Sequence, residues 1–160
     1  MKVQHIENNW MKAVLQRVNN AKVLINNIEE KIIDSGIVVL LGIDKNDNKE
    51  DADWLVNKIV NMRIFNDQTD FMNLSLIDIN GSIMIISQFT LIASTKKGNR
   101  PSYINAASHQ IAIPLYEYFI RMCKEKINDR VKAGVFGADM KIKLLNDGPV
   151  TIIIDTKDKE

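Results

Sequence analysis

The stretch GIVVLLGI, residues 36–43, restricts the fold of this 160-residue chain more than any other. It is a continuous apolar run bounded by glycines, which is typical of a strand buried on both faces. The chain is 46% apolar and 26% charged, so it can bury a real core around such a strand. We expect one compact domain over residues 11–160.

The remaining pattern predicts strands and two helices. Residues 12–18, 21–26 and 82–91 have strand-like patterns, with the acidic IEEK segment as a turn. Residues 139–146 and 149–155 are two further strands, separated by Asp147-Gly148. Ala52, Leu55, Ile59 and Met62 recur at helical spacing. The resulting order, βββ-α-β-α-ββ, is not the alternation of a doubly wound fold. It favours an α/β domain that is β-rich, with mixed sheets and two main helices.

The second helix lies within residues 108–127, and Ser108 is its expected N-cap. Pro114 conflicts with that start, because a proline inside a helix removes one backbone hydrogen bond. The sequence therefore predicts either a kink at Pro114 or a helix that begins near Ile113 with Pro114 at its first position.

Composition excludes several classes of protein. One cysteine, Cys123, rules out an internal disulfide and suits a reducing, cytoplasmic setting. Two histidines and one cysteine are too few for a Cys/His zinc cluster. No apolar run reaches the length of a membrane span, and residues 1–10 lack the pattern of a secretory signal. We interpret residues 1–10 as an extension. A formal charge of +1 argues against polyanion binding by bulk charge.

Familiar catalytic side chains are not evident. His109 lies at the expected start of a helix, where capping or solvent exposure is its expected role, and Cys123 is expected to pack in the core. Ser87 and Gln88 interrupt an apolar run, so they are either functional or satisfied by neighbours at a strand end. The loop KKGNRPSY follows, with Lys96, Lys97 and Arg100. It is either solvated or a local contact for phosphate or ribose.

Seven segments, taken together and in order, carry a resemblance that no single one of them carries: MKAVLQRV, LLGI, RIFND…MNLSL, SQFTL, KKGNRPSY, GVFGADM and NDGPVT. This set resembles the D-aminoacyl-tRNA deacylase family, also called D-tyrosyl-tRNA(Tyr) deacylases, which remove D-amino acids from mischarged tRNA. The resemblance covers nearly the whole chain from Met11. It implies a β-rich layered α/β domain that forms a homodimer, with active sites at the dimer interface.

The resemblance also explains why a strand should be entered through Gly-Pro. In the family this bond is cis and projects from one subunit into the pocket of the other, whereas base rates alone favour trans. Gly148 and Pro149 would then aim two carbonyl oxygens at the substrate's α-amino group. An L-residue would drive its side chain into this wall, and a D-residue would not. Arg17 matches a family arginine that holds the Gly-Pro loop, although alone it reads as an edge charge.

By the same resemblance, Ser87, Gln88, Phe89 and Thr90 line the reacting end of the pocket. Backbone amides near Phe89 would form an oxyanion hole. Thr90 lacks a base, so water attack assisted by the 2′-hydroxyl of the terminal adenosine is preferred over a threonine nucleophile. Phe136 and Met140 would be apolar walls around that adenosine, with core packing as the alternative.

The resemblance thus implies a hydrolase that needs no cofactor or metal, binds tRNA charged with D-amino acids or glycine, and performs chiral proofreading in translation quality control. A non-catalytic tRNA-binding dimer with the same fold is the alternative.

Overall fold

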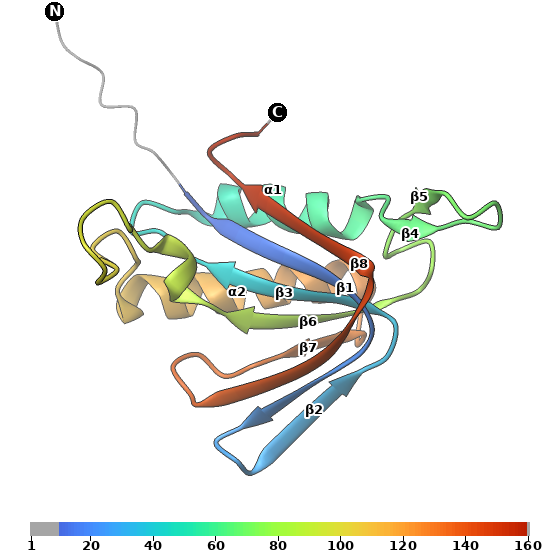
Figure 1. Cartoon of the computed structure of the whole chain (residues 1–160), viewed down its shortest axis with the longest axis horizontal. Coiled ribbons are helices and arrows are strands. Elements are labelled where there is room, and N and C mark those ends of the chain that lie inside the picture. The colour runs from blue at the N-terminus through green and yellow to red at the C-terminus, as the bar shows by residue number, and fades with distance from the viewer. Residues whose placement is uncertain (1–9, 160) are drawn as a thin grey trace, which may run out of the picture.

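The computed structural model describes residues 10–159. Its core is a six-stranded sheet whose one face is covered by two helices (Figure 1). The elements of the chain follow in order: β1 (Lys12–Ile25), β2 (Glu29–Ile33), β3 (Gly36–Gly42), α1 (Lys49–Asn61), β4 (Phe65–Asn66), β5 (Met72–Leu74), β6 (Ser82–Ser87), the 3₁₀ helix η1 (Phe89–Ile92), α2 (His109–Ile127), β7 (Val131–Ala133) and β8 (Met140–Asp155). The predicted α/β class with two main helices is confirmed.

The sheet is mixed, as predicted. Its order is β2-β1-β3-β6-β7, and β8 pairs with β1 as well. The pairs β3–β6 and β6–β7 are parallel, whereas the pairs that involve β1 are antiparallel. The sheet curls until its edge strands come together, where Lys31 Nζ of β2 donates to the Ala133 carbonyl of β7 at 2.7 Å. The result is a nearly closed, barrel-like sheet.

Strand β3 has both faces buried, as its sequence predicts. Ile37, Val39 and Leu41 belong to the core between the sheet and the helices. Val38 points the other way, into a second core on the concave face of the curled sheet, where Met84 also lies. Alternation along one strand therefore links two separate cores.

The N-terminal strands differ from the prediction. Residues 12–25 form one long strand, and the acidic segment belongs to β2 instead of a turn. The turn lies at Asn26 and Asn27, which both have positive φ, and the Ile28 amide donates to the Ile25 carbonyl. Two positive φ angles in succession match the twist of a hairpin, and asparagine tolerates them better than most residues.

Two other predicted boundaries, at the end of β6 and at residues 147–148, were wrong, whereas the predicted N-cap position of α2 was right. Strand β6 ends at Ser87, and residues 89–92 are a 3₁₀ helix instead of strand. Helix α2 begins at His109, with Ser108 at the N-cap position but without a side-chain capping bond, so Pro114 lies inside the helix. The two predicted C-terminal strands are the single strand β8.

The start of the described chain is packed against the domain. The amide of Trp10 donates to Asp47 at 2.6 Å, and its indole donates to the Asp155 carboxylate. The rest of the predicted extension lies outside the described residues. Within residues 10–159, no helix is both long and apolar enough to cross a membrane.

Candidate functional site

A cavity of about 580 Å³ lies where β6 ends and the chain turns into η1. The turn is tight because β3 and η1 approach closely: a Cβ on Gly42 would lie 2.9 Å from Leu91 Cβ. The Gln88 amide donates to the Leu41 carbonyl at 2.7 Å, which fixes the first residue after the strand. The cavity is lined by Ile86, Ser87, Gln88, Phe89, Ala106, Ala107, His109, Phe136, Gly137, Ala138, Asp139, Met140 and Ile142.

Five predicted site residues therefore meet at this cavity: Ser87, Gln88, Phe89, Phe136 and Met140. Phe136 also packs against the helix-side core, which agrees with the core-packing alternative, while its contact with adenosine stays a prediction. Met140 likewise packs on the concave core.

Thr90 lies beside the cavity and is not part of its lining. Its side chain is exposed, and Oγ1 accepts a hydrogen bond from Gln88 Nε2. The first amides of a short helix have no partner inside it. Gln88, at the N-cap of η1, makes no side-chain hydrogen bond to them. These first amides are those of Phe89 and Thr90.

The wall opposite η1 is supported from behind by helix α2. The Tyr116 hydroxyl lies 3.0 Å from the Ile85 carbonyl and 2.9 Å from the Gly134 carbonyl. Burial raises the pKa of Tyr116, so this phenol stays protonated. The Phe136 ring packs against Tyr116 and, edge to face at 5.5 Å, against His109.

His109 is a cavity residue that sequence reasoning missed. It is exposed at the first position of α2, as its helix-start prediction required, but it also faces the cavity. The sequence feature that could have indicated this place is the preceding INAAS segment, since its Ala106 and Ala107 line the same cavity.

A second group of predicted residues lies elsewhere on the chain. In the β1–β8 ladder, Gln16 pairs with Thr151 and Val18 pairs with Asn146. Between these pairs β1 has only Arg17, whereas β8 has the four residues 147–150. These four residues leave the ladder as a short excursion, in which Gly148 and Pro149 are exposed. Their peptide bond is cis, as the resemblance implied.

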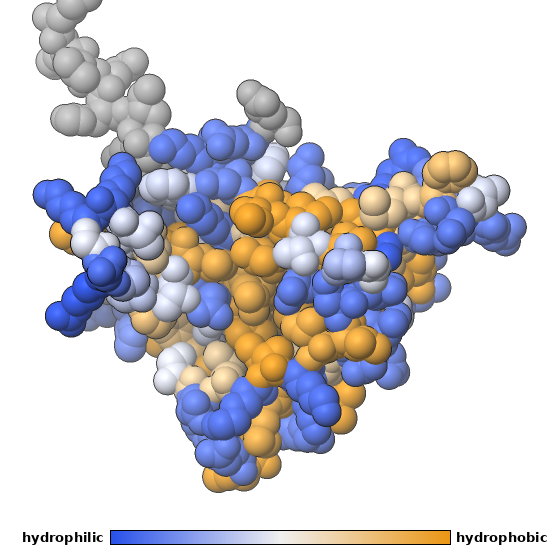
Figure 2. Space-filling model, viewed as in Figure 1, coloured by the Kyte–Doolittle hydropathy of each residue, from blue (hydrophilic) through white to orange (hydrophobic). Residues whose placement is uncertain are grey.

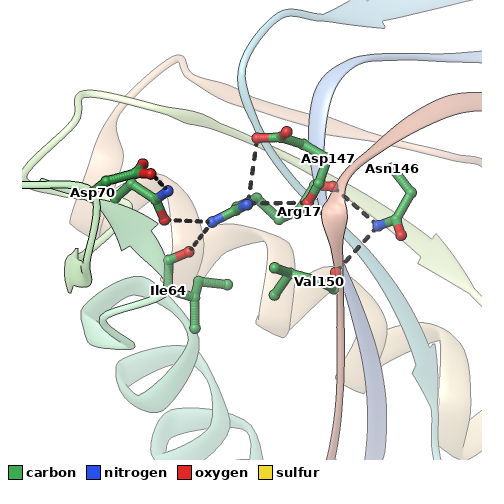
Figure 3. Close-up of polar contacts among 7 residues, drawn as sticks. Arg17, Ile64, Asp70, Asn146, Asp147 and Val150 are labelled. Carbon is green, nitrogen blue, oxygen red and sulfur yellow. Dashed lines mark hydrogen bonds and ion pairs between the residues drawn. The ribbon is translucent and has the colours of Figure 1, made fainter.

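Both ends of this excursion are fixed by side chains (Figure 3). Asn146 Nδ2 lies 3.1 Å from both the Arg17 carbonyl and the Val150 carbonyl, so it ties the two strands together. Arg17 is only 7% exposed, and its Nε lies 3.2 Å from the Asp147 carbonyl and 3.3 Å from the Asp147 carboxylate. Arg17 is therefore not the exposed edge charge that pattern alone favoured.

Gly148 is required by both conformation and space. Its φ of 119° is rarely adopted by residues with a side chain. A Cβ at this position would lie 2.9 Å from Arg17 Nη2. The excursion thus presents bare backbone next to a buried guanidinium.

The predicted tRNA-contact residues form a third group. Lys96, Lys97 and Arg100 lie on an exposed loop. Lys96 lines a smaller cavity of about 230 Å³ together with Trp10 and Lys12. This loop begins a few residues after η1, so its cations follow the main cavity along the chain.

Other chemistry has little support among the described residues. Cys123 is fully buried, as predicted, and burial raises the pKa of its thiol to about 12. Within residues 10–159, no three His, Cys, Asp or Glu side chains are grouped so that they could hold a metal ion.

Comparison with known proteins decides the family. The model of the D-Tyr-tRNA(Tyr) deacylase family matches residues 14–155. The chain belongs to this family. D-aminoacyl-tRNA deacylases of Flavobacterium psychrophilum and Bacteroides fragilis (strain YCH46) are each 55% identical to it over 150 residues, which cover 94% of this chain and 100% of either relative.

Solved structures agree with this membership. A protein described as a c-Myc DNA unwinding element binding protein is 37% identical, with a TM-score of 0.84 over 89% of this chain and 97% of its own. A structure described as a probable eukaryotic D-amino acid tRNA deacylase is 18% identical, with a TM-score of 0.80 over 91% and 99% of the two chains, and it shows the shared deacylase fold.

Proposed function

We propose that this chain hydrolyses the ester of D-aminoacyl-tRNA and releases free D-amino acid and tRNA. Membership of a deacylase family is the basis for the reaction, and relatives that align over their full length at 55% identity are D-aminoacyl-tRNA deacylases. The observation that carries the chiral part of the proposal is the exposed Gly148-Pro149 backbone, held on an excursion clamped by Arg17 and Asn146. A cytoplasmic location, where charged tRNA is used, belongs to the same proposal.

The active site is composed of two subunits in this proposal. The lining of the main cavity includes no residue of the excursion, so one chain offers the two halves of the site separately. A homodimer would bring the excursion of one subunit to the cavity of its partner. Leu145 and Ile153 of β8 are 54% and 74% exposed, and apolar surface gathers over the face that carries β8 and β1 (Figure 2). Covering this face would favour association.

Chirality is read by exclusion. The carbonyl oxygens of Gly148 and Pro149 accept hydrogen bonds from the substrate's α-ammonium group. With the ammonium and the ester fixed, the side chain of an L-residue points into the Gly-Pro wall, and that of a D-residue points away. Glycine has no side chain to exclude, so glycyl-tRNA is also hydrolysed.

Hydrolysis then proceeds by water attack. The water oxygen bonds to the ester carbonyl carbon, the bond from that carbon to the ribose oxygen breaks, and a proton of the water passes to the departing ribose oxygen. The vicinal 2′-hydroxyl assists this transfer. The Phe89 and Thr90 amides stabilise the oxyanion that forms on the carbonyl oxygen. Ser87, Gln88 and the Thr90 hydroxyl orient the ester and the water.

The terminal adenosine and the tRNA backbone are bound by the predicted site residues that have no role so far. Phe136 and Met140 form apolar walls for the adenosine. Lys96, Lys97 and Arg100 meet phosphates of the acceptor end, which places the positive charge of a nearly neutral protein where it is needed.

The first test compares hydrolysis of D-Tyr-tRNA and L-Tyr-tRNA by the purified full chain, with and without a chelator. We expect rapid loss of the D-ester alone, unaffected by chelation. Equal loss of both esters would contradict the chiral wall. If the chain binds charged tRNA and leaves both esters intact, the alternative of a non-catalytic tRNA-binding dimer is correct.

A second test addresses the composite site by mixing two inactive variants. Gly148→Ala spoils the excursion, and Ala138→Trp fills the cavity, because Ala138 is part of its lining. After unfolding and refolding together, half of the dimers carry one variant of each kind. Each such dimer has one site with both parts intact, so about a quarter of the wild-type activity should return. No recovery would contradict a site shared between subunits.

A further inference from the structure

Arg17 has contacts beyond the excursion, and these lead to the hairpin formed by β4 and β5. Its Nη1 donates to the Ile64 carbonyl at 2.8 Å and to Asn66 Oδ1 at 3.2 Å. The same guanidinium bonds Asp147 through Nε (Figure 3). One buried cation therefore connects the hairpin to the residue directly before Gly148.

Asn66 is itself held in one orientation. Its Nδ2 donates to Asp70 Oδ1 at 2.9 Å, so its amide oxygen is directed at Arg17. Because an amide has distinct donor and acceptor ends, this bond decides which end the guanidinium meets. Asp70 thus selects the acceptor face of Asn66.

The turn that carries Asp70 is ordered by Asp67. The Asp67 carboxylate accepts hydrogen bonds from the Thr69 amide at 2.8 Å, the Thr69 hydroxyl at 2.7 Å and the Phe71 amide at 3.2 Å. These bonds lower the pKa of Asp67, with the Thr69 hydroxyl contributing most. The Asp70 amide also donates to the Asp67 carbonyl at 3.1 Å. Asp70 is consequently presented from a preorganised turn.

We propose that Asn66 and Asp70 are positioning residues for the Gly148-Pro149 excursion and act on it through Arg17. This inference rests on the proposed function, in which the excursion forms the chiral wall. The guanidinium lies directly against Gly148, since a Cβ there would be 2.9 Å from Nη2. Without Asn66, Nη1 keeps only the Ile64 carbonyl as its acceptor, so the guanidinium is held less tightly and the backbone packed on it gains room. The hairpin is far from Gly148 in the sequence, yet it sets how closely the Gly-Pro backbone confines the substrate.

The test uses the full-length protein and measures kcat/KM for D-Tyr-tRNA and L-Tyr-tRNA. Asn66→Ala should reduce the ratio of the D value to the L value about tenfold, the effect of losing one hydrogen bond to a charged group. Asn61→Ala is the matched control: Asn61 is also exposed and bonded within its own element, through Nδ2 to the Asn57 carbonyl at 2.9 Å. It should leave the ratio unchanged.

Exchanging the side chains of Asn66 and Asp70 tests the coupling between them more directly. Asn66→Asp alone places two carboxylates face to face and should lower the ratio. The double change Asn66→Asp/Asp70→Asn restores a donor and an acceptor in opposite order, keeps an acceptor toward Arg17, and should recover most of the ratio. A double variant as impaired as Asn66→Asp would overturn the proposed coupling.

A readout independent of catalysis separates this inference from the proposed function. The Arg17 Nε–H resonance in a ¹H–¹⁵N spectrum of the free protein should shift and broaden in Asn66→Ala and not in Asn61→Ala. Failure of the wild-type protein to hydrolyse D-Tyr-tRNA would refute the function and leave this signature intact. An unchanged Arg17 resonance together with an unchanged D-to-L ratio in Asn66→Ala would refute the positioning role.

Discussion

The Tyr116 hydroxyl on α2 lies 2.9 Å from the carbonyl oxygen of Gly134. Gly134 directly follows β7, and the segment after it forms one wall of the main cavity. A single phenol thus connects the helix layer to the wall that holds Phe136. The shape of the cavity depends on a side chain that does not line it.

Tyr116→Phe should therefore destabilise the protein without removing its core packing. The ring stays, but the Gly134 carbonyl loses its tyrosine donor, whereas the Ile85 carbonyl still accepts from the Gly134 amide at 2.9 Å. We expect the free energy of unfolding to fall by about 1–3 kcal/mol, the cost of leaving a buried polar group unpaired. Urea denaturation followed by circular dichroism measures this. Tyr118→Phe is the control, because the Tyr118 hydroxyl bonds an exposed carboxylate, that of Asp53, and its loss should cost far less.

Gly148→Ala should abolish turnover of D-Tyr-tRNA, with a loss of at least about a hundredfold in kcat/KM. The new Cβ would lie 2.9 Å from Arg17 Nη2 and 3.0 Å from Val150 Cγ2, at a φ that disfavours any side chain. The bare backbone would have to move away from its present position.

Gly98 provides the comparison for this variant. It also has a positive φ, 60°, but a Cβ there would meet no atom within 4 Å. Gly98→Ala should carry a smaller backbone cost, because residues with a side chain, such as Asn128 at 59°, adopt a φ near 60°, and it should keep the preference for the D-ester. Retention of full D-Tyr-tRNA turnover by Gly148→Ala would show that close approach of this glycine is unnecessary.

Thr90→Ala distinguishes the two mechanisms for ester cleavage. Thr90 Oγ1 accepts from Gln88 Nε2, and an orienting hydroxyl is worth roughly one hydrogen bond. We expect kcat to fall about tenfold under single-turnover conditions. A covalent threonine intermediate requires this oxygen, so its removal would then eliminate catalysis. Residual activity near the background rate would favour the nucleophile.

Stability should depend on pH through Asp47. Burial raises the pKa of this carboxyl to about 7, despite the hydrogen bonds from Asp44 and Trp10 that lower it, and the neighbouring Asp51 adds to the rise. The unfolded chain releases this proton near pH 4. Between pH 4 and pH 7 the folded state therefore binds more protons, and the free energy of unfolding falls as pH rises.

Thermal unfolding between pH 5 and pH 8 measures this dependence. The melting temperature should be higher at pH 5 than at pH 8 in the wild-type protein. Asp47→Asn, which cannot ionise, should show a smaller slope over the same window. Equal slopes for the two proteins would assign the dependence to other groups.

The fold could be predicted from the sequence where alternation and burial agree. The burial of both faces of β3 could be predicted because Ile37, Val38 and Val39 are all apolar. Helix α1 could be predicted because Ala52, Leu55 and Ile59 recur at helical spacing and share one buried face. Turns were harder, because Asn26 and Asn27 resemble ordinary polar residues until their φ angles are known.

The candidate site was harder to predict from the sequence than the fold. SQFTL and NDGPVT indicated two groups of candidate residues through resemblance, but nothing in their spacing revealed that residues 147–150 stay outside the lining of the main cavity. Asn66 lies in the RIFND segment of the resemblance, but no role could be assigned to it, because its hydrogen bond is to Arg17, 49 residues away in sequence. Contacts between distant segments are set by the curl of the sheet, which a local pattern does not contain.

The β1–β8 ladder resumes on both sides of the four-residue excursion, at Gln16–Thr151 and Val18–Asn146. In an ordinary strand, inserting or deleting one residue would turn every later side chain to the opposite face. Here the unpaired residues 147–150 lie between two ladder pairs, so a change in their number does not shift the pairing beyond them. Ile152 and Ile154 keep their places in the fold. The length of this segment can therefore be changed by design while the paired parts of β8 keep their register.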